Sequence, residues 1–71
     1  MSKKRDIYFN NSVSFIIDEY IHKKVVRDML KDKLIDGLTF REIAEKYGYT
    51  IRHTQRLIYK YQEIVFDHYK P

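Results

Sequence analysis

The feature that most constrains this fold is the stretch 37–61, GLTFREIAEKYGYTIRHTQRLIYKY, which contains two helix-start signals around one helix-stop signal. Thr39 precedes Glu42 by three residues, a capping box in which each side chain satisfies a free backbone N–H at a helix start. Gly48 supplies the left-handed conformation that commonly ends a helix. Thr50 is a second N-cap. The predicted elements are a helix over about 40–47, a turn over 48–50 and a second helix from about 51.

Apolar residues recur at helical spacing in both predicted helices. In the first helix, Ile43, Ala44 and Tyr47 fall on one face, and Ala44 is small where another helix must approach closely. The positions of the second helix that face back towards the first are Ile51, Thr54, Leu57, Ile58 and Tyr61. Two amphipathic helices that face each other across a tight turn predict a helical hairpin.

This hairpin resembles the helix-turn-helix motif. The residues that carry the resemblance are Ile43-Ala44, Gly48 four positions later, Thr50, and Thr54 with Leu57 as the buried pair of the second helix. With Gly37-Leu38-Thr39 in front, the stretch resembles the promoter-reading, region 4-like helix-turn-helix of sigma factors. It is also similar to small regulators from phages and mobile elements of Gram-positive bacteria. Thr54 departs from the pattern, in which Val or Ile is usual, but it is β-branched and fits sterically.

The resemblance implies a sequence-specific protein that binds double-stranded DNA and acts in bacterial or phage transcription. Such a protein would work by occupancy, blocking or recruiting RNA polymerase, without chemistry of its own. Two alternatives stay open, because folds of this kind serve several functions. One is a protein-interaction module that binds polymerase, a nuclease or packaging machinery. The other is a DNA-architectural or recombination accessory factor.

The second helix carries most of the residues expected to contact DNA. No Asp or Glu occurs from Thr50 to Tyr61, whereas both Arg and Lys do. Arginine pairs bidentately with guanine, and glutamine can do so with adenine. The expected DNA-binding residues are Thr50, Arg52, His53, Gln55, Arg56, Tyr59, Lys60 and Arg41, with Lys46 as a further candidate for phosphate contact. Ile51 either touches a thymine methyl group or is buried against the first helix, and Tyr49 is expected to be a core residue with its hydroxyl in water.

Composition limits the other possibilities. A chain of 71 residues predicts one domain of marginal stability, because so short a chain buries only about 60% of its unfolded surface. The formal net charge of +4 favours acidic partners, nucleic acid first. The absence of cysteine excludes disulfides and thiolate metal sites, and it suits the cytoplasm, which we expect as the location. No apolar run approaches the roughly 18 residues of a membrane span, so no membrane association is predicted.

The sequence predicts no enzyme, no cofactor and no metal site. It has neither a cysteine nucleophile nor a glycine-rich phosphate loop. His22, His53 and His68 are far apart and lack the spacing of paired metal ligands.

The predicted architecture is all-α, a small helical bundle in which the helix-turn-helix has an extended C-terminal recognition helix. Residues 1–11 are expected to form a partly flexible arm, with an extended apolar segment at 6–9 and an N-cap at Asn11 or Ser12. Residues 12–71 would form the helix-turn-helix domain, with the motif at about 39–61. The segment 12–36 is either one helix or two that meet near His22-Lys23, and we favour two. Gly37 would end it, with a solvated charged face made by Lys24, Arg27, Asp28, Lys31 and Asp32.

The recognition helix is expected to continue to about residue 69, further than the motif needs. The apolar residues of its C-terminal half are Ile64, Val65, Phe66 and Tyr69. They need a partner. Either this end packs within the chain, on Ile7, Phe9, Phe15 and Ile16, or it forms a two-fold homodimer through the C-terminal helix. The two arrangements are compatible with each other.

Overall fold

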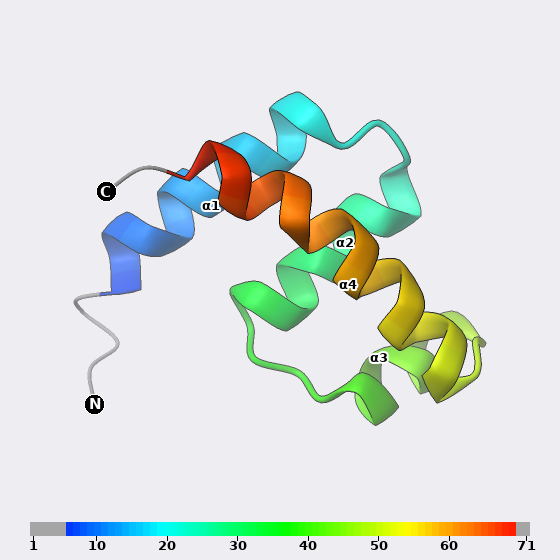
Figure 1. Ribbon diagram of the computed structural model, residues 1–71. Coiled ribbons are helices and arrows are strands. Elements are labelled where there is room, and N and C mark those ends of the chain that lie inside the picture. The colour runs from blue at the N-terminus through cyan, green and yellow to red at the C-terminus, as the bar shows by residue number, and fades with distance from the viewer. Residues whose placement is uncertain (1–5, 70–71) are drawn as a thin grey trace.

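The computed structural model describes residues 6–69 and contains four α-helices in that range (Figure 1). They are α1 (Asp6–Tyr20), α2 (Lys24–Leu34), α3 (Phe40–Tyr47) and α4 (Ile51–His68). No strand occurs in this part of the chain, so the predicted all-α bundle is confirmed. None of these helices is both long and apolar enough to cross a membrane. Residues 1–5, which the sequence assigns to a flexible arm, lie outside the described range.

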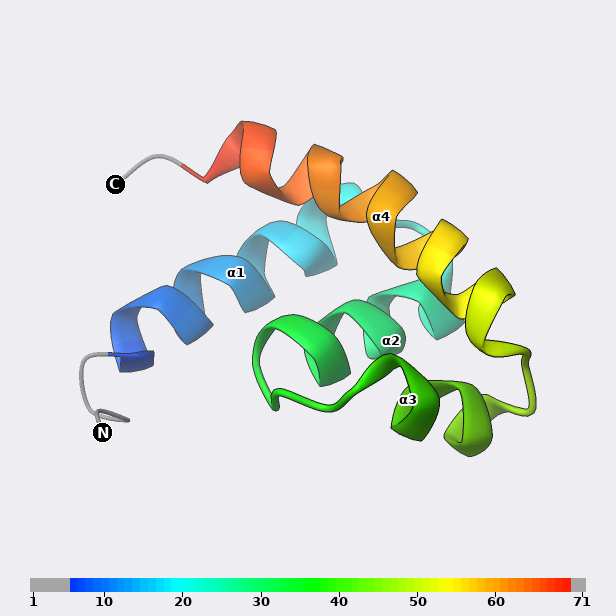
Figure 2. The same ribbon diagram turned by 60° about the horizontal axis from the view of Figure 1, so that its bottom comes forward.

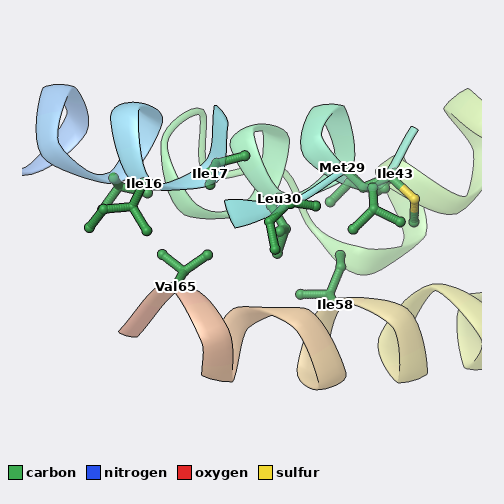
Figure 3. Packing of buried hydrophobic residues seen from close by; sticks show 10 residues of the cluster. Ile16, Ile17, Met29, Leu30, Ile43, Ile58 and Val65 are labelled. Carbon is green, nitrogen blue, oxygen red and sulfur yellow. The ribbon is translucent and has the colours of Figure 1, made fainter. Parts of the chain in front are cut away.

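The longest helix, α4, contacts each of the other three helices, as α2 also does. Its C-terminal half runs beside α1, its middle lies over α2, and its N-terminal end packs on α3 (Figures 1 and 2). Val65 points from α4 towards Ile16 of α1, and Ile58 points towards the side of the core that holds Ile43 of α3 (Figure 3). The buried apolar residues are Val13, Ile16, Ile17, Ile21, Val26, Met29, Leu30, Ile43, Ala44, Ile58 and Val65. One continuous core therefore joins all four helices.

The N-terminal part of the fold differs from the sequence prediction. Helix α1 begins at Asp6, so the expectation of an extended segment over 6–9 was wrong. Asn11 and Ser12 lie inside the helix and do not form its N-cap. The reason is packing: Phe9 contacts Tyr69 edge-on at 5.3 Å between ring centres, and the helical spacing of apolar residues continues through Val13 into the core. Burial of this face outweighs the weak helix propensity of the Asn-Asn-Ser sequence.

The predicted pair of helices between 12 and 36 is confirmed, with residues 21–23 between α1 and α2. The break contains no glycine or proline, and a side chain from α2 satisfies the backbone at the end of α1 instead. The guanidinium of Arg27 donates to the backbone carbonyls of Ile21, at 3.1 Å, and His22, at 2.8 Å. Carbonyl groups left free at the end of α1 are thereby satisfied. At its other end, α2 stops at Leu34 with Ile35 as the C-cap, earlier than predicted, so Gly37 lies two residues beyond the cap, where it adopts a left-handed φ of 76°.

The prediction of a solvated charged face on α2 is wrong at Asp32, because the side chain of Asp32 is buried. Its carboxylate accepts hydrogen bonds from Lys46 Nζ, at 3.1 and 3.0 Å, and from the Tyr47 hydroxyl, at 2.7 Å. Both partners lie on α3, so the cluster ties α3 to α2. The hydrogen bond to Asp32 raises the pKa of Lys46 above its ordinary value. Burial, followed by the hydrogen bond to Asp32, raises the pKa of Tyr47.

Alkaline pH tests this cluster. The folded state raises both pKa values. The stability that these two groups contribute is therefore complete below their ordinary pKa values, 10.0 for Tyr47 and 10.5 for Lys46. It is lost as the pH rises through the higher folded-state pKa values. We expect urea denaturation to show a steep fall in the wild-type free energy of unfolding above pH 10. Asp32→Asn should cost about 1–3 kcal/mol at pH 8 and show a shallower alkaline fall.

The matched control is Asp28→Asn, which breaks the exposed pair between Asp28 and Lys24. That pair should contribute no more than about 1 kcal/mol. Equal alkaline slopes for the wild type and Asp32→Asn would contradict the assigned role of Asp32.

Thr54 lies at the centre of the α4 face that packs on the core, and its side chain is fully buried. Its hydroxyl oxygen has no hydrogen-bond partner among the described residues. A buried hydroxyl without a partner loses its hydration and recovers nothing. Threonine has the branched shape of valine, so it fits this buried position sterically, but its hydroxyl is poorly suited to an apolar surrounding.

Replacing this hydroxyl should stabilise the protein. We expect Thr54→Val to raise the free energy of unfolding by about 1 kcal/mol, because it removes the unsatisfied group and keeps the branched shape. Thr54→Ser is the matched control: it keeps the hydroxyl, loses the methyl group and should be less stable than the wild type. Urea denaturation of the three proteins measures both differences in the free energy of unfolding. A Thr54→Val protein that is less stable than the wild type would show that the Thr54 hydroxyl does have a partner.

Candidate nucleic-acid interface

The turn between α3 and α4 is built by the capping residues that the sequence identified. The backbone N–H of Thr39 donates to Glu42 Oε1 at 2.8 Å, and the N–H of Glu42 donates to Thr39 Oγ1 at 3.1 Å, so the capping box is confirmed. Gly48 adopts the left-handed conformation, with φ 76°. The N–H of His53 donates to Thr50 Oγ1 at 3.0 Å. These local bonds fix where α4 starts, and therefore which of its residues face outward.

The outward face of α4 carries most of the predicted site residues. Those that are exposed on α4 or at its N-cap are Thr50, Arg52, His53, Arg56, Tyr59 and Lys60, while Gln55 is half-buried at the flank. Arg52, Arg56 and Lys60 follow each other at intervals of four residues, so they form one stripe along the helix. The stripe is directed away from Thr54 and Ile58, which are buried. His53, Arg56, Leu57 and Lys60 line a shallow hollow beside it.

Ile51 and Tyr49 flank the start of this face. The side chain of Ile51 is 39% exposed, so the alternative of a residue buried against the first helix is not what the structure has. Tyr49 is half-buried, and its ring contacts the ring of His53 edge-on, at 4.9 Å between centres. This contact limits the orientations open to the His53 ring.

Ion pairing divides the basic residues into two groups. The Lys and Arg side chains of α2, and Lys46 of α3, already have partners within the fold. They are Lys24 with Asp28, Arg27 with two carbonyl groups, Lys31 with Asp18, Lys33 with the Leu38 carbonyl, and Lys46 with Asp32. By contrast, no hydrogen bond or ion pair within residues 6–69 involves the side chains of Arg41, Arg52, Arg56, Lys60 or, in the α1–α2 connection, Lys23. Within the described range, the unpaired positive charge is therefore concentrated on α3 and α4.

Lys46 does not fit its predicted role. It was expected as a free cation for phosphate contact, but its ammonium group is bound to the Asp32 carboxylate. No local sequence pattern indicates this pair, because the two residues are fourteen positions apart on different helices. Arg41, also on α3, remains exposed as predicted.

Tyr59 is held in place by a contact that sequence reasoning missed. Its ring packs edge-on against Phe40 of α3, at 5.4 Å between ring centres. The ammonium of Lys33 in turn lies 4.3 Å from the centre of the Phe40 ring. Tyr59 is nevertheless half exposed, so α3 supports its ring while part of the side chain remains accessible.

The basic stripe ends before α4 does. Glu63 and Asp67 are exposed on the same face, one and two turns beyond Tyr59 and Lys60. Carboxylates repel phosphate, so the electrostatically favourable length of α4 is limited to about its first three turns. The first turn contains no acidic residue and presents free backbone N–H groups, which also favour an anion.

The three histidines lie on separate parts of the fold. His22 is in the α1–α2 connection, and His53 is near the start of α4. His68, near the end of α4, stacks on Tyr20 at 3.7 Å between ring centres, and its Nδ1 lies 2.9 Å from the Ile64 carbonyl oxygen. Within residues 6–69, no group of three potential metal ligands is clustered.

Comparison with protein families, with curated proteins and with solved structures found no match for this chain.

Proposed function

We propose that this protein binds double-stranded DNA by placing the N-terminal half of α4 in the major groove, and that it acts as a transcriptional regulator of bacterial or phage type. The observation that carries the proposal is the stripe of exposed, unpaired cations on α4, directly after a capped helix-turn-helix turn. Within the described chain, cations elsewhere are mostly used in internal bonds, whereas Arg52, Arg56 and Lys60 are not. The resemblance to the promoter-reading motif of sigma factors supports the same conclusion.

The chemistry of the stripe suggests a division of roles. Arg52 and Arg56 lie in the first two turns of α4, where a recognition helix meets base edges, and each can pair bidentately with guanine. Gln55 and His53 flank them. Tyr59 and Lys60 are further from the start of α4, and Arg41 lies on α3. These three residues are suited to phosphate contacts, which contribute affinity but not sequence information. Thr50 would bind phosphate at the helix N-terminus while it caps the helix.

The alternative of an interaction module that works through the end of α4 has less support. Val65 is fully buried, and Ile64 and Tyr69 are half-buried against the rest of the fold. These residues pack within the chain, as one of the two predicted arrangements has it, with Tyr69 against Phe9. Phe15, which was expected to take part in this packing, is instead 63% exposed. Of the four apolar residues at the end of α4, only Phe66 is well exposed. A DNA-architectural factor would use the same basic stripe. A bending assay separates it from a regulator, because a regulator needs site preference and not a large bend.

Fluorescence anisotropy with a labelled random-sequence duplex tests DNA binding. We expect wild-type affinity to fall steeply between low and near-physiological salt, because bound cations release counterions from the phosphates. Arg52→Ala/Arg56→Ala should weaken binding by at least about tenfold and reduce the salt dependence. Both side chains are exposed, so circular dichroism should show an unchanged fold.

The matched control is Lys23→Ala/Lys24→Ala, which removes the same charge from the start of α2. It should change binding far less if the location of the charge, and not its sum, matters. If the two double variants lose DNA affinity equally, binding reflects only the net charge of the protein, and the stripe on α4 has no special role. Absence of wild-type binding at low salt would overturn the proposal, because nonspecific phosphate attraction would then be missing.

Thr50 allows stability and DNA binding to be separated at one position. Aspartate is as good an N-cap as threonine, so Thr50→Asp should keep the free energy of unfolding within about 0.5 kcal/mol of the wild type. The added carboxylate would repel a phosphate at the start of α4, so DNA affinity should fall at least about tenfold. Thr39→Asp makes the same change at the N-cap of α3 and serves as the control. If both variants bind DNA equally well, Thr50 lies away from the phosphates.

A further inference from the structure

The shallow hollow on one flank of α4 gathers side chains that carry nitrogen donors. His53, Arg56, Leu57 and Lys60 line it, and its volume is about 220 Å³. His53 and Arg56 are three residues apart, and Arg56 and Lys60 are four apart, so these three side chains project from the same flank. Among the described residues, no Asp or Glu lines the hollow. It is therefore suited to an anion, and on the proposed recognition helix that anion is a DNA phosphate.

The His53 ring lies at this hollow with its nitrogens unused. The backbone N–H of His53 donates to Thr50 Oγ1 at 3.0 Å, which fixes the residue in the first turn of α4. The ring packs edge-on against Tyr49, at 4.9 Å between ring centres and 89° between the ring planes. Within residues 6–69, no hydrogen bond involves either ring nitrogen. A positioned imidazole therefore keeps its nitrogens available for a ligand.

The charged groups of α3, which packs against this end of α4, do not pair with His53 in the described part of the chain. Glu42 belongs to the capping box, and Lys46 is bound to Asp32. The other charged side chains of α3, both at exposed positions, are Arg41 and Glu45. The titratable group that contacts the ring from outside α4 is Tyr49, in the turn.

The charged side chains of α2 are also engaged elsewhere. Each has a partner within the fold: Lys24 with Asp28, Arg27 with two carbonyl groups, Lys31 with Asp18, Asp32 with Lys46, and Lys33 with the Leu38 carbonyl. No salt bridge within residues 6–69 satisfies His53, so a negative partner for its ring has to come from a ligand.

A phosphate in the hollow would place negative charge beside an imidazole whose neighbours there, Arg56 and Lys60, are cations. Histidine is the side chain whose charge ordinarily changes between about pH 5 and 8. A nearby anion favours the imidazolium form, in which both ring nitrogens are donors. By linkage, the imidazolium form binds phosphate more tightly than the neutral ring does. Phosphate binding and proton uptake are therefore coupled.

We propose that the hollow binds a phosphate of the DNA backbone and that His53 takes up one proton from solvent when the phosphate binds. The inference rests on the proposed DNA binding and adds a control of it by pH. His53 and Lys60 hold the phosphate, while Arg56 borders the hollow and has further N–H donors for a guanine. DNA affinity is therefore highest in mild acid and falls as the pH rises, because the ring then releases its proton even in the complex.

Fluorescence anisotropy of the full chain with a random-sequence duplex, at fixed ionic strength and without phosphate buffer, tests the coupling. We expect the wild type to bind at least about fivefold more tightly at pH 5.5 than at pH 8. His53→Gln and His53→Lys should each bind equally at both pH values, the first because it is never charged and the second because it always is. The side chain of His53 is exposed, so circular dichroism should show both variants folded at both pH values.

His22→Gln and His68→Gln are the matched controls, because they remove the other two histidines of the chain, which do not line the hollow. Both should keep the pH dependence of the wild type. If the wild type binds equally at both pH values, or if His53→Gln keeps the pH dependence, the proposal is overturned while DNA binding itself stands. Absence of binding at either pH would remove both proposals.

Salt dependence separates a phosphate partner from a base. An imidazolium that binds phosphate releases one more counterion, so the slope of log affinity against log salt should be steeper by about 1 at pH 5.5 than at pH 8 in the wild type, but not in His53→Gln. The pH effect should also be equal for a G·C-rich and an A·T-rich duplex, because phosphate contacts carry no sequence information. A pH effect confined to the G·C-rich duplex would assign His53 to a guanine edge and contradict the phosphate site.

The ring signals of His53 in NMR spectra distinguish a DNA phosphate from a free anion. At about pH 7, equimolar duplex should shift these signals towards the imidazolium form. The same concentration of inorganic phosphate should leave them unchanged, because one shallow hollow without the rest of the DNA contacts binds weakly. A full shift with inorganic phosphate would show a site for the free ion and would overturn the assignment to the DNA backbone.

Discussion

The buried stripe of α4 is the constraint on which the rest of the structure depends. Ile58 and Val65 are two turns apart on one face, and together they contact the cores of α1, α2 and α3. Among the helices of residues 6–69, only α4 and α2 contact all three of the others, and α4 is the longer of the two. Burial of aliphatic side chains of this size typically contributes about 1.5–3 kcal/mol each, which is large compared with the stability of so short a chain. The buried inner face thus fixes the orientation of α4, and this orientation exposes its outer face to solvent.

The distribution of exposed charge also follows from internal packing, because some charged side chains are bound within the fold and others are left at the surface. Asp32 is buried and bound by Lys46 and Tyr47, so one of the acids on α2 holds α3 in place instead of facing solvent. Arg27 closes the end of α1 through two carbonyl groups. These internal bonds take up cations of α2 and α3. Among residues 6–69, the exposed cations that remain lie mainly on the outer face of α4 and at Arg41, so the positive charge of this part of the chain is directed to one side.

The α3–α4 hairpin was predicted closely because its signals are local. Thr39, Glu42, Gly48 and Thr50 act on backbone groups a few positions away, so their effect depends little on the rest of the chain. The N-terminal segment was predicted incorrectly for the opposite reason. Its Asn-Asn-Ser sequence favours a turn in isolation, and the packing of α1 against α2 and α4 outweighs that preference. The break at residues 21–23 is correct in position, but its cause, the Arg27 side chain, was not foreseen.

The sequence by itself determined the ends of α3, the start of α4 and the face of α4 that turns outward, because caps and apolar periodicity lie close together there. The tertiary structure decided which charges remain free, whether Thr54 finds a partner for its hydroxyl, and where α1 begins. Asp32 and Lys46 illustrate the physical reason. Each has the same local chemistry as an exposed residue, and only the packing of α2 against α3 brings them within hydrogen-bond distance.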